Sequence, residues 1–147
     1  MVRKAIQVAN IGERLAALTP IAMRGPHTSD AEVADAFTTL ADFRDGGIFV
    51  GGFTGDSGWE IHPKGDEIVQ ILAGATELTI MHDDGPETFE LTAGMLIVVP
   101  RGHWHRFDSR SGVSLMTATP QPTTHTFVDD PRGVDLGPLS EGAASSE

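Results

Sequence analysis

Short runs rich in β-branched residues follow one another from Gly46 to about Pro120, separated by Gly, Asp and Pro. The runs read GIFVGGF, EIVQILAG, TELTIMH, ETFEL, MLIVV and VSLMTATP, and their length and composition are typical of β-strands. About eight short strands in about 75 residues predict a sandwich or a barrel. The segment HDDGPET (82–88) has the composition of a hairpin loop and predicts antiparallel pairing of the strands on either side.

The first third of the chain has a helical pattern. Ser29 precedes Glu32 by three residues, which is the spacing of a capping box, and apolar residues follow at helical intervals. This pattern predicts a helix over 30–42. A shorter helix around 12–18 would end before Pro20.

Three regions follow from these patterns. Residues 1–45 are expected to form a helical extension packed on the strands, and residues 46–128 to form the β-domain. Residues 129–147 contain much Gly, Pro and Ser and few large apolar side chains. We expect them to form an irregular tail without a strand or helix, lying at most along the surface.

Composition excludes several classes of partner. The 10 Lys and Arg residues against 21 Asp and Glu give a formal charge of −11, which repels nucleic acids and anionic membrane surfaces. No cysteine is present, so a metal would need nitrogen and oxygen ligands. The sequence contains no signal-peptide pattern or membrane-spanning run, and we expect a soluble, cytoplasmic protein.

Two polar segments could converge inside such a β-domain. In GWEIHPKGDE (58–67), Glu60 and His62 share one face of an extended strand, and a turn can bring Glu67 beside them. In GMLIVVPRGHWHRF, residues 100–102 suit a type I turn, with Pro second and Gly fourth, that would present His105 on a new strand. Taken alone, the acidic residues fit an ordinary solvated strand face as well as a metal site.

The two segments resemble the two motifs of the cupin family. The first motif, with two histidines one residue apart followed by a glutamate and a glycine, is similar to Glu60-x-His62-x4-Glu67-x6-Gly74. The second motif, which supplies a further histidine, is similar to Gly94-x5-Pro100-x-Gly102-x2-His105. The resemblance implies an all-β fold, an antiparallel jelly-roll barrel. The pattern of residues 1–45, which lie outside the resemblance, adds a short helical N-terminal region.

The resemblance also implies a metal site. Its ligands would be Glu60, His62, Glu67 and His105, holding a divalent Mn, Fe, Ni, Co or Zn ion. Two departures stand out: Glu60 occupies the place of the family's first histidine, and Ser109 the place of an asparagine that usually closes the second motif. A glutamate can still bind the ion through oxygen.

Three functions are compatible with this site. The first is a metal-dependent enzyme acting on a small organic molecule, of the dioxygenase, decarboxylase, isomerase or lyase type, for which no general base can be named. The alternative is a non-catalytic small-molecule-binding protein with a degenerate metal site. A purely structural barrel ranks last, because buried ionisable groups without a cation are costly.

The neighbouring residues carry further expectations. His103 is expected beside the site or at its rim, and His27, His82 and His125 are expected in solvent. By strand alternation Trp59 and Trp104 lie outside the cavity, covered by the helix over 30–42 or by a second subunit, and similar small cupins commonly form homodimers. The cavity walls are expected to include Phe53, Val69 and Ile71, with either Leu115 or Met116.

Overall fold

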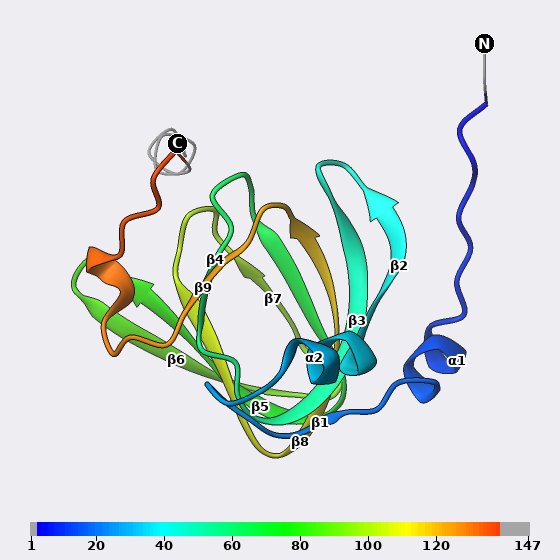
Figure 1. The fold of residues 1–147 in the computed structure, drawn as a ribbon, viewed down its shortest axis with the longest axis horizontal. Coiled ribbons are helices and arrows are strands. Elements are labelled where there is room, and N and C mark those ends of the chain that lie inside the picture. Colours follow the sequence, from blue (N-terminus) through cyan, green and yellow to red (C-terminus); the bar gives the residue numbers. More distant parts are fainter. Residues whose placement is uncertain (1–2, 139–147) are drawn as a thin grey trace.

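One curled β-sheet dominates the computed structural model, which describes residues 3–138 (Figure 1). The elements, in chain order, are α1 Ile11–Ala16, β1 Ile21–Arg24, α2 Asp30–Ala36, β2 Phe37–Phe43, β3 Gly46–Asp56, β4 Trp59–Ile61, β5 Glu67–His82, β6 Gly85–Thr92, β7 Leu96–Val99, β8 His105–Pro120, β9 Thr124–Thr126 and a 3₁₀ turn at Pro131–Gly133. The prediction of an all-β fold is confirmed. In residues 3–138, no helix is long and apolar enough to cross a membrane.

Two 16-residue strands, β5 and β8, run antiparallel to each other through the middle of the sheet. Strand β3 pairs with β8, β2 pairs with β3, and β6 and β7 pair with β5, all of them antiparallel. The β5–β6 hairpin confirms the pairing predicted around HDDGPET. Strand β1 runs parallel to β3. The twist between neighbouring strands curls this sheet into the half barrel seen in Figure 1.

Alternate side chains of β5 and β8 are buried inside the half barrel. The apolar ones are Val69, Ile71, Leu78, Ile80, Phe107, Val113 and Leu115. Each such side chain stabilises the fold by about 1.5–3 kcal/mol when fully buried. Glu67 and His105 occupy the first positions of these same buried faces, so the fold places two ionisable groups at the edge of its apolar core.

Gly74 allows β5 to continue where two separate runs were predicted. The register with β8 shifts on both sides of this residue, and its φ is +77°, in the left-handed region. A Cβ atom at this position would lie 2.1 Å from the carbonyl oxygen of Gly112. Only glycine fits here, for both reasons.

The predicted helix over 30–42 is correct only in its first half. Ser29 and Glu32 form the predicted capping box, each accepting from the other's backbone N–H at 3.1 Å. The helix ends at Ala36, and Phe37–Phe43 forms β2 instead. Pairing with β3 and the β-branched residues after Phe37 outweigh the helical spacing. The segment 1–45 therefore supplies two strands as well as two helices.

The two tryptophans are buried outside the cavity, but their cover differs from the prediction. Trp59 and Trp104 pack with Ile61, and the side chains of Val134 and Leu136 lie against this cluster. The C-terminal segment is held there by Arg132, which donates to the carbonyl oxygen of Asp83 at 2.9 Å. Within the described chain, the cover is therefore this C-terminal segment rather than the helix. The 3₁₀ turn in this segment also departs from the irregular tail expected, while residues 139–147 lie outside the described chain.

Candidate metal centre

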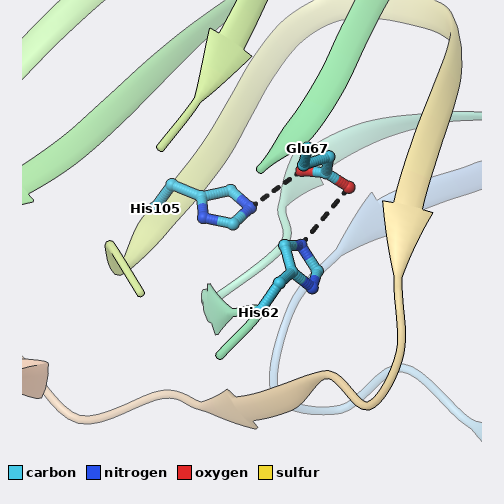
Figure 2. Close-up of side chains that lie close together, drawn as sticks. All are labelled: His62, Glu67 and His105. Atoms are coloured by element: carbon cyan, nitrogen blue, oxygen red, sulfur yellow. Dashed lines mark ion pairs between the residues drawn. The ribbon is translucent and has the colours of Figure 1, made fainter. Parts of the chain in front are cut away.

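Three polar side chains meet at one end of the half barrel (Figure 2). His62 follows β4, Glu67 begins β5 and His105 begins β8. The Nε2 atom of His62 lies 3.3 Å from Oε2 of Glu67, and the Nε2 atom of His105 lies 3.1 Å from Oε1. All three side chains are buried. The structure thus brings together three of the four predicted ligands, with donor atoms within 4.8 Å of one another.

A tight turn before β8 orients His105. The turn closes through a hydrogen bond from His103 N to Pro100 O at 3.2 Å, so it begins one residue later than predicted. Gly102 occupies its third position with a φ of +71°, which is typical of a type II turn rather than the predicted type I. The N–H of Gly102 also donates to the carbonyl oxygen of His62 at 3.1 Å, which ties the two motifs together.

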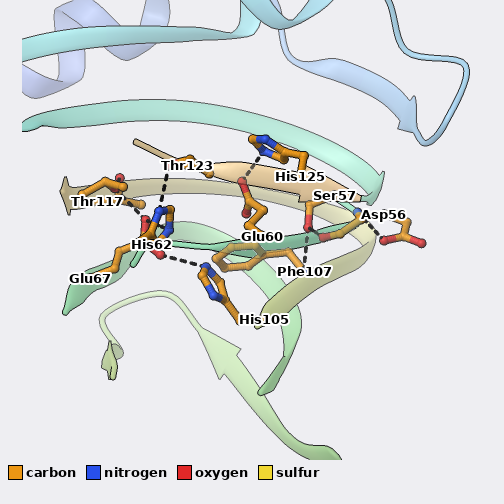
Figure 3. Close-up of polar contacts among 12 residues, drawn as sticks. Asp56, Ser57, Glu60, His62, Glu67, His105, Phe107, Thr117, Thr123 and His125 are labelled. Carbon is orange, nitrogen blue, oxygen red and sulfur yellow. Dashed lines mark hydrogen bonds and ion pairs between the residues drawn. The ribbon is translucent and has the colours of Figure 1, made fainter. Parts of the chain in front are cut away.

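Hydrogen bonds from surrounding residues fix the three side chains, and Figure 3 shows the one between Thr123 and His62. Nδ1 of His105 donates to the carbonyl oxygen of His103 at 3.0 Å, so Nε2 carries the lone pair in the neutral ring. Thr119 donates to Oε2 of Glu67 at 2.6 Å. Thr123 bonds Nδ1 of His62 at 2.8 Å. Support of this kind on the atom remote from the ion is typical of metal ligands in proteins.

Three buried atoms of this cluster have no hydrogen-bond partner in the described chain: Nε2 of His62, Oε1 of Glu67 and Nε2 of His105. Nε2 of His105 faces Oε1 of Glu67 and Nε2 of His62 faces Oε2, both at ion-pair distances but without the angles of hydrogen bonds. Buried polar atoms are rarely left in this state, because each loses its water without replacement. A cation among them would satisfy all three at once. The residues therefore fit a divalent metal with mixed nitrogen and oxygen ligands.

The electrostatics of the metal-free cluster point the same way. Burial alone would raise the pKa of Glu67, but the facing imidazoles of His105 and His62 hold it far below its ordinary value. Burial alone would lower the pKa of His105, but the Glu67 carboxylate raises it. The Glu67 carboxylate thus favours positive charge on the neighbouring imidazole, in the place where a cation could act instead.

Glu60, the fourth predicted ligand, lies in the same cavity but outside the three-residue group. Its backbone pairs with His105 across β4 and β8. Its Oε2 atom contacts Nε2 of His125 on β9 at 2.7 Å, and this bond lowers the pKa of Glu60 against the opposing effect of burial. His125 is half-exposed, in keeping with the expected contact with solvent, but its bond to Glu60 and its place in the cavity wall were not predicted.

The cavity beside the cluster has a volume of about 390 Å³, within the range of small-molecule sites. Phe53 and Leu115 line it as predicted, whereas Met116 does not; Val69 and Ile71 belong to the packed core instead. The strand prediction missed other aromatic and charged wall residues. These are Phe37, Phe49, Phe107 and Arg24.

The remaining histidines lie outside this cavity. His103 supports His105 through its backbone carbonyl, and its ring packs against His82 with 5.8 Å between centroids. This agrees with its expected place beside the site. His82 is partly exposed and contacts Glu87 at 2.9 Å.

Comparison with known proteins identifies the domain. The family model described as Cupin domain (Cupin_2) matches residues 52–118. The protein contains a cupin domain. The matched residues run from β3 to β8 and include all four predicted metal ligands. The jelly-roll fold implied by the two motifs is therefore confirmed.

Solved structures share this cupin fold at low sequence identity. A cupin-2 domain containing protein from Shewanella frigidimarina has a TM-score of 0.59 and 18% identity, over 78% of this chain and 95% of that one. A protein from Neisseria meningitidis has a TM-score of 0.54 and 21% identity, over 78% and 100%. Hydroquinone 1,2-dioxygenase from Sphingomonas sp. TTNP3, with 4-hydroxybenzoate bound, has a TM-score of 0.56 and 14% identity, over 86% of this chain and 83% of that one. Identities this low establish likeness of fold alone. A comparison with curated proteins found no significant match.

Proposed function

We propose that this cupin is a divalent-metal-dependent enzyme acting on a small organic molecule. The observation that carries the proposal is the convergence of three buried donor atoms without hydrogen-bond partners, from His62, Glu67 and His105. Imidazole nitrogen and carboxylate oxygen suit Mn, Fe(II), Ni, Co and Zn. When bound, such an ion supplies Lewis acidity to an oxygen atom of the substrate. Dioxygenase, decarboxylase, isomerase and lyase reactions are the proposed range.

Glu60 is the proposed fourth ligand. It lines the same cavity as His62 and Glu67, and Oε1 of its carboxylate has no hydrogen bond to any residue in the described chain. Binding the same ion as the other three would require its side chain to turn away from His125. With three protein ligands, a tetrahedral ion would keep one coordination position for substrate or water. With four, only an ion of higher coordination number would keep one.

The alternative is a non-catalytic cupin that binds a small molecule at a degenerate metal site. The substitution of glutamate for the family's first histidine, and the bond between Glu60 and His125, favour this second candidate. The two candidates differ in metal content and turnover. A protein that retains its cavity without stoichiometric metal would fit the binding function.

Metal analysis of the purified protein and three variants tests the proposal. We expect about one equivalent of metal in the wild type and in Glu87→Ala, and none in His105→Ala. Glu87 is a matched control because it makes a carboxylate–imidazole contact with His82 away from the cavity. Metal retained in Glu60→Ala would remove Glu60 from the ligand set and leave the centre intact. Absence of metal from the wild type after supplementation with each ion would refute the enzyme proposal.

We also propose that the protein forms a homodimer. Apolar side chains are exposed on the outer face of the sheet, where Ile68 and Val98 pair across β5 and β7 and are 44% and 50% exposed. Phe43 lines a surface groove together with Ile68 and Val98. Exposed apolar patches of this kind favour protein contacts. Light scattering should give a dimeric mass for the wild type and a monomeric mass for Val98→Lys; a monomeric wild type would refute the dimer.

A further inference from the structure

Arg24 brings a positive charge into the cavity that contains the candidate metal centre. It ends β1, in the N-terminal segment that precedes the family match, and it lines the same cavity as His62 and Glu67. Its guanidinium carbon lies 4.7 Å from the ring centroid of Phe53 and 5.2 Å from that of Phe37. Stacking on two aromatic faces fixes the plane of the guanidinium while leaving its edge available.

The Arg24 guanidinium has no hydrogen bond or ion pair with any residue in the described part of the chain, although the side chain is partly buried. Burial lowers its pKa, and the charges of Glu60 and Asp56 oppose this effect. Both carboxylates are engaged elsewhere, Glu60 by His125 and Asp56 by Arg106. None of its five N–H donors therefore has an acceptor within hydrogen-bond reach in the described part of the chain.

The backbone around Arg24 is held tightly. The register of β1 with β3 places Arg24 opposite Gly55, and a Cβ atom on Gly55 would lie 2.4 Å from both the nitrogen and the oxygen of Arg24. The preceding residue, Met23, donates its N–H to Oγ1 of Thr54 at 2.8 Å. Because the backbone is fixed and the guanidinium already packs on Phe37 and Phe53, the side chain has less entropy to lose when it binds a ligand.

We propose that Arg24 binds the carboxylate group of a substrate whose apolar body packs against the phenylalanine side chains of the cavity. This assignment rests on the proposed function only in calling that ligand a substrate. Arginine pairs with carboxylates and phosphates through two parallel hydrogen bonds. The carboxylate is favoured because Glu60 and Glu67 line the same cavity, and their charges repel a dianion more strongly than a monoanion.

Binding of four small probes tests this inference. Titrations followed by ligand-observed NMR would compare phenylacetate, its neutral isostere phenylacetamide, phenyl phosphate and acetate. We expect phenylacetate to bind the wild type most tightly, and Arg24→Met to weaken its binding about tenfold or more while leaving phenylacetamide unaffected. Arg24→Lys should restore part of the loss, since it keeps the charge but not the paired hydrogen bonds.

Arg44→Met is the matched control. Arg44 also stacks on a phenylalanine, 5.4 Å from the centroid of Phe43, but outside this cavity. Its replacement should change no affinity. Equal phenylacetate binding by wild type and Arg24→Met would overturn the inference, as would no binding by the wild type. Tighter binding of phenyl phosphate would overturn the choice of carboxylate.

The same titrations, repeated after chelator treatment, separate this inference from the metal proposal. Discrimination between phenylacetate and phenylacetamide that depends on Arg24 should persist without metal, because the guanidinium acts directly on the anion. A protein that binds metal but does not discriminate would overturn only the role of Arg24. A protein that discriminates but never binds metal would refute only the enzyme proposal.

Discussion

The ring of His105 is oriented by the residue two positions before it, since its Nδ1 donates to the backbone carbonyl of His103 at 3.0 Å. The side chain of His103 plays no part in this bond. We therefore expect His105→Ala to lower metal affinity by at least about 100-fold, because a first-row ion loses one of its imidazole ligands. His103→Ala, which keeps the carbonyl, should stay within a few-fold of wild type. Isothermal titration with Zn²⁺ or Mn²⁺ would measure both, and equal losses would contradict the assigned roles.

The Thr119 hydroxyl donates to Oε2 of Glu67 at 2.6 Å, inside the buried face of the sheet. Thr119→Val keeps the shape but removes this donor, and we expect metal affinity to fall about 10- to 100-fold, as for other residues that hold a ligand in place. Among the residues that the structure describes, the Thr117 hydroxyl bonds only that of Thr119, at 2.7 Å. Thr117→Val is the control and should have the smaller effect; the reverse order in the same titration would refute this role of Thr119.

Protonation of the cluster predicts opposite pH dependences for the metal-free and metal-bound protein. The lowered pKa of Glu67 stabilises the fold at pH values above about 4.3, the pKa of glutamate in the unfolded chain. This contribution is lost as pH falls through the pKa of the folded state. The raised pKa of His105 stabilises the fold at pH values below about 6.5, the pKa of histidine in the unfolded chain. This contribution is lost as pH rises through the pKa of the folded state. Between about pH 4.3 and 6.5 the metal-free cluster therefore contributes most to stability.

Metal binding requires His105 to lose its proton, so the rise in melting temperature on adding metal should be larger at pH 8 than at pH 5.5. Thermal unfolding with and without one divalent ion, across this range, measures the difference. Glu67→Gln removes the charge that raises the pKa of His105 and should flatten the dependence of the metal-free protein on pH above 6.5. A metal effect that is equal at both pH values would refute the coupling.

The cluster of His62, Glu67 and His105 could be anticipated because its residues occupy fixed places in two short motifs around turns. The rest depended on pairings that no local pattern specifies. Phe37 is spaced as a helical residue, yet strand pairing with β3 decides its conformation. His125 reaches Glu60 only because the three-residue strand β9 pairs with β4; the β-branched neighbours Thr124 and Thr126 are the one signal that could have suggested it.

Gly74 and Gly94 separate two reasons for requiring glycine. Both have positive φ, +77° and +90°, so alanine strains the backbone at either position by about 1 kcal/mol. Only at Gly74 would the new Cβ overlap another backbone atom, the carbonyl oxygen of Gly112. We expect Gly74→Ala to destabilise the protein by about 1–3 kcal/mol more than Gly94→Ala, as for other overpacked sites. Equal midpoints in urea unfolding would show that β5 and β8 can separate without cost.

The segment that covers the tryptophans makes the last prediction. Val134 and Leu136 pack on Trp59 and Trp104, whereas Val128 is exposed. Replacing Val134 and Leu136 together by serine removes apolar cover at about 0.8 kcal/mol per lost buried CH₂. We therefore expect lower stability and a red shift of the tryptophan emission, since water would reach both indoles. Val128→Ser should change neither. An unchanged emission spectrum in the double variant would mean that another surface, such as a second subunit, shields the tryptophans in solution.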